Sequence, residues 1–97
     1  MVAGAFFGLV GNRVGGGLMT AKAFVLIETK VGNSKNVVNK LKRLAGVKSA
    51  DSVTGPYDVI AIVESESLND IGDLITGKIH PIGGISRTVA CLALSFD

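Results

Sequence analysis

Two short apolar runs along the chain have the length and composition of buried β-strands. Residues 23–27 read Ala-Phe-Val-Leu-Ile, and residues 59–63 read Val-Ile-Ala-Ile-Val. β-Branched and aromatic residues favour strands, and both runs are too short for a buried helix. Residues 47–53 alternate loosely in polarity, as in a strand with one wet face or at a sheet edge. A long last strand is predicted over residues 85–96.

A first helix is predicted after Gly32, with Asn33 or Ser34 as its N-cap. Its apolar positions follow helical spacing and comprise Val37, Val38, Leu41 and Leu44. Gly46 stands where a left-handed C-terminal cap belongs, so we expect the helix to end there. The exposed side of this helix is basic through Lys35, Lys40, Lys42 and Arg43. A solvated face opposite the apolar stripe explains these charges more simply than phosphate contact.

A second helix is predicted from Ser67, which with Asp70 forms a capping box in which Asp replaces Glu. Its apolar stripe consists of Leu68, Ile71, Leu74 and Ile75. Gly77 and Pro81 are expected to stop it before the last strand.

The resulting order βαββαβ predicts an α+β, ferredoxin-like fold: a four-stranded antiparallel sheet with both helices on one face. A solvated second face would show alternating polarity, but residues 24–27, 59–63 and 89–94 are apolar at nearly every position. We therefore expect both faces to be buried. The simplest cover is a second copy, which predicts a dimer that packs sheet on sheet; the N-terminal segment is the alternative cover.

Composition narrows the function classes. The chain has 97 residues, which suits one domain, and its ten Lys+Arg and eight Asp+Glu give a net charge of only +2. This charge does not favour nucleic-acid binding, and apart from Phe24 the central strands lack the aromatic side chains of RNA readers. The single cysteine, Cys91, excludes an internal disulfide, indicates the cytoplasm and is expected to be buried and inert. We expect no metal site, cofactor or membrane span.

Residues 1–18 differ from the rest, because they hold six of the 13 glycines and Arg13 as their sole charge. They make a poor secretory signal, since no basic region precedes the interrupted apolar run. We interpret them as a Gly-rich extension, an expression tag or a misassigned start, and residues 19–97 as the domain.

Three motifs within residues 23–96 together resemble the effector-binding (RAM) domain of Lrp/AsnC transcriptional regulators. They are Gly46-Val47, the hairpin residues Thr54-Gly55-Pro56-Tyr57-Asp58-Val59, and Gly84-Ile85-Ser86-Arg87-Thr88. Family members usually carry an N-terminal helix-turn-helix, for which residues 1–18 are unsuited. The resemblance therefore implies a stand-alone domain that binds a small effector, commonly an amino acid, and assembles as dimers and rings of dimers. We expect such a domain to act either by itself or by co-assembling with a full-length Lrp/AsnC regulator.

The hairpin offers chemistry suited to an amino acid, since Gly55 permits close backbone approach and the Asp58 carboxylate can accept from an ammonium group. The alternative is that Asp58 caps the turn and Tyr57 packs on the dimer seam. The resemblance favours the site and implies ligand contacts from Thr54, Gly55, Tyr57, Asp58 and Thr88. In the family, a second Thr is frequent at the position of Ala90, and Pro is frequent at the position of Gly83. These two differences weaken the expectation of effector contacts from the last strand.

The function predicted is a non-enzymatic sensing module that acts in transcriptional regulation through assembly rather than by binding DNA. The alternative is a small dimeric enzyme such as a cofactor-independent monooxygenase, which uses the same fold. Such an enzyme needs polar side chains in a cleft between sheet and helices, and here they gather at the hairpin. His80 is interpreted as a surface histidine, because no second His or Cys accompanies it.

Overall fold

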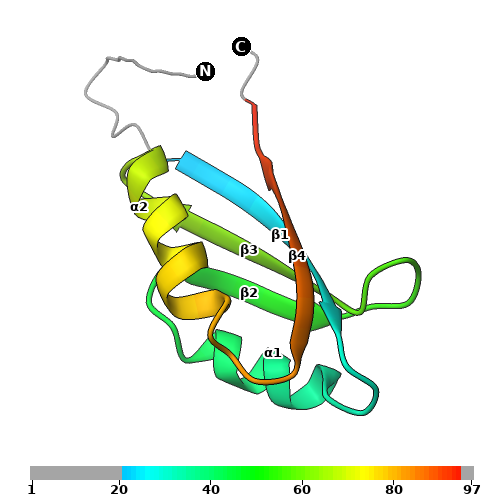
Figure 1. Cartoon of the computed structure of the whole chain (residues 1–97). Helices are drawn as coiled ribbons and strands as arrows, with labels where there is room; N and C mark the ends of the chain where they lie inside the picture. Colours follow the sequence, from blue (N-terminus) through cyan, green and yellow to red (C-terminus); the bar gives the residue numbers. More distant parts are fainter. Residues whose placement is uncertain (1–20, 95–97) are drawn as a thin grey trace.

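The computed structural model describes residues 21–94, and within them strands and helices follow the predicted order βαββαβ. The elements are β1 (Ala21–Thr29), α1 (Ser34–Lys42), β2 (Val47–Ser52), β3 (Val59–Ser65), α2 (Leu68–Leu74), a π-helical segment η1 (Ile75–Ile79) and β4 (Ile85–Leu92). The four strands form an antiparallel sheet in the order β2-β3-β1-β4, and both helices cover one face (Figure 1). The predicted ferredoxin-like fold is thus confirmed. The predictions for residues 1–18, and for the last strand beyond residue 94, lie outside the described residues.

The two faces of the sheet differ, because neighbouring residues of a strand point to opposite sides. On β1, Ala23, Val25 and Ile27 are fully buried under the helices. Their cross-strand partners on β3, namely Val63, Ala61 and Val59, are also buried. The remaining side chains of the central strands lie on the opposite side, which we call the open face; its apolar part comprises Phe24, Leu26, Ile60, Ile62, Val89 and Cys91.

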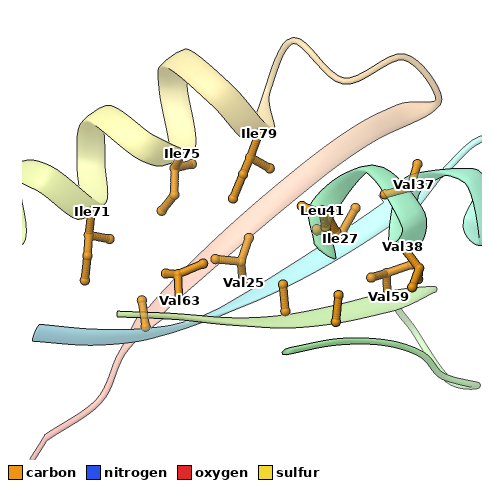
Figure 2. Packing of buried hydrophobic residues seen from close by; sticks show 13 residues of the cluster. Val25, Ile27, Val37, Val38, Leu41, Val59, Val63, Ile71, Ile75 and Ile79 are labelled. Carbon is orange, nitrogen blue, oxygen red and sulfur yellow. The ribbon is translucent and has the colours of Figure 1, made fainter. Parts of the chain in front are cut away.

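The core lies between the sheet and the helices. Ile71, Ile75 and Ile79 extend from α2 and η1 toward Val25 and Val63 (Figure 2). The residues of α1 that enter the core are Val37, Val38 and Leu41, which lie over Ile27 and Val59 (Figure 2). Full burial of each such aliphatic side chain contributes about 1.5–3 kcal/mol to stability. The apolar sides of α1, α2 and η1 therefore cover the same side of the sheet.

The described part of the single chain leaves the second face of the sheet partly exposed, so its expected cover by a second copy or by the N-terminal segment stays a prediction. Phe24, Leu26, Ile60 and Ile62 are half-buried, because neighbouring strands shield them but no other element within residues 21–94 packs on top of them. Cys91, expected to be buried, is exposed. It pairs with Phe24 across the ladder and so lies on the open face.

Both helices end differently from the sequence prediction. α1 ends at Lys42 rather than at Gly46, although Gly46 does adopt a left-handed conformation (φ 95°) in the turn to β2. Its N-cap residue Asn33 makes no capping bond and donates instead to the Val31 carbonyl. No helix within residues 21–94 is long and apolar enough to span a bilayer.

α2 begins as predicted, since the Ser67 hydroxyl accepts the Asp70 N–H at 3.1 Å. Gly77 does not stop the helix, because the chain continues through it as η1, with the His80 N–H bonded to the Ile75 carbonyl at 2.8 Å. Pro81 has no N–H with which to continue this series, so the helix ends before it.

Candidate functional site

The predicted site residue Asp58 joins the β2–β3 hairpin to the end of β1. Its Oδ2 accepts the backbone N–H of Thr29 at 2.8 Å in a partly buried position. Its own N–H donates to the Ile27 carbonyl, and its carbonyl accepts from Val53, both at 2.9 Å. Asp58 is therefore held by its backbone and by one carboxylate oxygen, which fixes the direction of the carboxylate.

The start of β4 holds the end of β1 from the other side. The Lys30 N–H donates to the Gly84 carbonyl at 2.8 Å, and the Ser86 hydroxyl donates to the Glu28 carbonyl at 3.0 Å. Gly84 has φ 98°, a conformation that residues with a side chain rarely adopt. The hairpin, the end of β1 and the start of β4 thus form one connected end of the sheet.

Tyr57 connects the hairpin to β4 through a side-chain contact. The Arg87 guanidinium donates to the Tyr57 hydroxyl at 2.8 Å and lies 5.7 Å from the centre of its ring. This hydrogen bond raises the pKa of Arg87, and the negative charge of Glu28 acts in the same direction. Arg87 pairs with Glu28 across the ladder, so a permanent positive charge lies on the open-face side of this end.

The tip of the hairpin is exposed to solvent. Thr54, Gly55 and Pro56 are exposed, and Gly55 has φ 132°. A Cβ built on Gly55 would meet nothing within 4 Å. Gly55 is therefore required by its backbone conformation, and the space beside it is free for another group.

Thr88 lies away from the other predicted site residues. It pairs with Ile27 and so faces the helix side of the sheet, where its hydroxyl is 2.8 Å from Nε2 of His80. His80 is exposed, as predicted for a surface histidine, and follows η1. The structure thus brings Tyr57 and Asp58 to one end of the sheet, with Thr54 and Gly55 at the adjoining tip, but it turns Thr88 to the opposite face.

Sequence reasoning missed two polar partners, Arg87 and His80. Arg87 belongs to a motif that was recognised, but its contact with Tyr57 depends on β4 lying beside β1, which local pattern does not reveal. The His80–Thr88 contact likewise depends on where η1 ends. Within residues 21–94, no group of three or more His, Cys, Asp or Glu side chains is arranged to hold a metal ion.

Comparison with known proteins identifies the family. The profile of the Lrp/AsnC ligand binding domain matches residues 22–96. Among solved structures, the chain is similar to FFRP-DM1, with 36% identity, a TM-score of 0.73 and coverage of 76% of this chain and 99% of that one. The hypothetical protein PHS023 from Pyrococcus horikoshii gives 36% identity, a TM-score of 0.73 and coverage of 80% and 93%.

AsnC of E. coli is 25% identical with a TM-score of 0.73, over 78% of this chain but 52% of AsnC. No curated protein matches significantly. The profile covers most of the chain, and PHS023 shares more than a third of its residues over nearly its whole length. The chain therefore belongs to the family of Lrp/AsnC ligand-binding domains.

Proposed function

We propose that this domain senses a small effector, an amino acid, and acts in transcriptional regulation by assembling with other copies or with full-length Lrp/AsnC regulators in the cytoplasm. The observation that carries the proposal is the end of the sheet where Asp58 and the Arg87–Tyr57 pair meet the hairpin. Membership of a family of regulatory ligand-binding domains supports a sensing role rather than catalysis. The low net charge of +2 supports a role that does not involve direct DNA contact.

Two of the charged groups at this end, Asp58 and Arg87, match the two charges of an amino acid. One Asp58 oxygen bonds the Thr29 N–H, and an ionised carboxylate has further lone pairs with which to accept an ammonium group. The Arg87 guanidinium has five N–H donors. One of its nitrogens donates to the Tyr57 hydroxyl, and the N–H groups on its other nitrogens can bind a carboxylate. Charge-assisted hydrogen bonds of this kind are shorter and stronger than neutral ones.

The position of Thr88 supports a site shared between copies. Its hydroxyl faces the helix side, whereas Arg87 lies on the open-face side of the same strand. An effector that contacts Thr88 as well as Arg87 would do so most simply where two copies meet. We therefore propose that a complete site needs an assembly of at least two chains, built from dimers that pack through their open faces.

A thermal-shift screen of the amino acids, followed by isothermal titration with the best one, tests the sensing role. A bound effector raises the melting temperature, because it stabilises the folded state by mass action. Asp58→Asn keeps a carbonyl oxygen for Thr29 but removes the charge. Loss of a charged pairing worth about 1.5–3 kcal/mol should weaken binding about ten- to a hundredfold.

Asp51→Asn is the matched control, since Asp51 is an exposed carboxylate on β2. It should leave affinity unchanged. Equal affinities of wild type and Asp58→Asn would remove Asp58 from the site. If no amino acid binds the wild type, the sensing proposal in this form is wrong.

A further inference from the structure

His80 and Thr88 form a polar pair on the helix side of the sheet. Nε2 of His80 is 2.8 Å from the Thr88 hydroxyl oxygen. His80 is exposed and Thr88 is half-buried. His80 is the single histidine of the chain, and histidine is the side chain whose charge normally changes between pH 5 and 8. The contact therefore joins a titratable ring to one of the residues predicted to bind the effector.

The pair lies on a part of the helix side that the helices leave accessible. α1 contacts mainly β2 and β3, and α2 contacts mainly β3 and β1, so neither lies over β4. The next two residues of β4 on the same side as Thr88 are Ala90 and Leu92, and both are exposed. A ligand can thus reach the Thr88 hydroxyl and the His80 ring together from solvent.

The strands beneath this pair present no charged side chain to it. Glu28 and Arg87 point to the open face, and the helix side of β1 and β4 carries uncharged residues. Lys30, which follows β1 directly, is basic and exposed. Residues 74–88 contain no acidic residue. A protonated His80 ring therefore has no carboxylate facing it from these two strands or from its own loop.

The helical elements around the pair add mostly basic residues. The loop after His80 lies against the N-cap residue of α1 at Gly84, and the first turn of α1 holds Lys35 but no acidic residue (Figure 1). η1 holds Lys78. Asp73 of α2 precedes His80 by seven residues, which is roughly 10 Å along a helix. A carboxylate brought by a ligand would thus meet mainly positive surroundings.

A protonated His80 ring and the Thr88 hydroxyl have the donors that a carboxylate needs. Both ring nitrogens carry a hydrogen in the protonated form, so Nε2–H donates to the Thr88 oxygen and Nδ1–H remains available. The Thr88 O–H is then available to donate as well. Two donors beside a positive charge suit a carboxylate, because charge-assisted hydrogen bonds are stronger than neutral ones. A neutral ring lacks the charge and one of its N–H donors.

We propose that His80 is an effector-binding residue, which together with Thr88 binds the side-chain carboxylate of an acidic amino acid when the ring is protonated. The inference rests on the proposed sensing function, in which Asp58 binds the ammonium group, Arg87 binds the α-carboxylate and Thr88 comes from a second copy. The side chain is then the part of the effector left for the His80–Thr88 pair. Binding becomes tighter as the pH falls through the range in which histidine gains its proton, while a side-chain carboxylate stays ionised above about pH 5.

Isothermal titration with matched amino acids at pH 6 and pH 8 tests the proposal. Glutamate and glutamine, like aspartate and asparagine, have nearly the same size but differ in side-chain charge. The acidic member of the preferred pair should bind the wild type about tenfold or more tightly at pH 6, and this preference should shrink at pH 8. His80→Gln should lose both the preference and its pH dependence. His80→Lys, which carries a permanent charge, should keep the preference at both pH values.

Lys42→Gln is the matched control, since Lys42 is exposed in the last turn of α1 and its loss also removes one positive charge. It should bind like the wild type. The ring signal of the single histidine in the proton NMR spectrum gives a second readout in the wild type itself. The preferred acidic amino acid should shift this signal at a lower concentration than its amide.

The outcomes separate this inference from the sensing role. If an amide binds as tightly as its acid at pH 6, or if His80→Gln keeps the wild-type pH profile, the assignment of His80 is wrong and the sensing role stands. If no amino acid binds at either pH, both proposals fail.

Discussion

At the scale of single residues, the Asp58 carboxylate bonds to β1 rather than capping the hairpin turn. Its carboxylate holds the Thr29 N–H across the end of the sheet, which is a structural role, and the same carboxylate is our proposed ammonium acceptor. We predict that Asp58→Ala lowers the free energy of unfolding by about 1–3 kcal/mol, because it leaves a partly buried N–H without its acceptor. Asp58→Asn should cost less, since its amide oxygen accepts the same bond. Urea unfolding of both variants checks this order, and equal losses would contradict it.

Two glycines at this end of the sheet have unusual backbone conformations but different surroundings. Gly55 has φ 132° and open space beside it, whereas a Cβ on Gly84, at φ 98°, would lie 2.9 Å from Cβ of Asn33. Either change to Ala introduces backbone strain of about 1–3 kcal/mol. We predict that Gly84→Ala destabilises the fold more than Gly55→Ala, because it adds a steric clash with Asn33. Thermal unfolding of the two variants measures the difference, and a smaller loss for Gly84→Ala would refute the steric explanation.

At the scale of elements, α2 continues as η1 through Gly77, the glycine at which the sequence predicts the helix to stop. Gly77 lies inside η1, has an ordinary φ, and a Cβ there would meet nothing within 4 Å. Glycine in a helix interior costs about 0.5–1 kcal/mol relative to alanine. We predict that Gly77→Ala raises the melting temperature, and that Gly72→Ala, in α2 with equally open space, gives a similar gain. A loss of stability in Gly77→Ala alone would mean that η1 requires glycine for its geometry.

The sequence predicted the buried strands and the start of α2, but not the end of α1 or the contacts between distant residues. The runs at residues 23–27 and 59–63 predicted β1 and β3, because burial under helices leaves a strong apolar signal. The hydrogen bond that begins α2 was also predicted, since Ser67 and Asp70 are three residues apart. The end of α1 was missed, because Gly46 does adopt φ 95° but serves the turn to β2 rather than the helix. Contacts such as Tyr57–Arg87 join residues 30 positions apart and depend on strand order, which no local pattern encodes.

At the scale of the whole molecule, the two faces of the sheet differ in burial within residues 21–94. The helix side buries Val25, Ile27 and Val63 fully, whereas the open face leaves apolar side chains half-exposed. The sequence pattern predicts burial of both faces, and the proposed dimer would supply the cover that residues 21–94 of a single chain do not provide. The exposed Cys91 fits the same explanation, since a copy packed on the open face would cover its thiol.

The last prediction concerns Leu26, which lies near the middle of the open face between Ile60 and Val89. Leu26→Lys places a charge where the proposed dimer excludes water, and loss of a buried leucine alone corresponds to about 1.5–3 kcal/mol. We therefore predict a rise in the dimer dissociation constant of about a hundredfold or more, seen as a 10.0 kDa monomer by sedimentation. Val31→Lys, at a fully exposed loop position, is the matched control and should remain dimeric. The Cys91 thiol provides a second measurement: it should react with a thiol reagent slowly in the wild type and in Val31→Lys, but quickly in Leu26→Lys. Equal reaction rates in all three would show that the open face is free in solution.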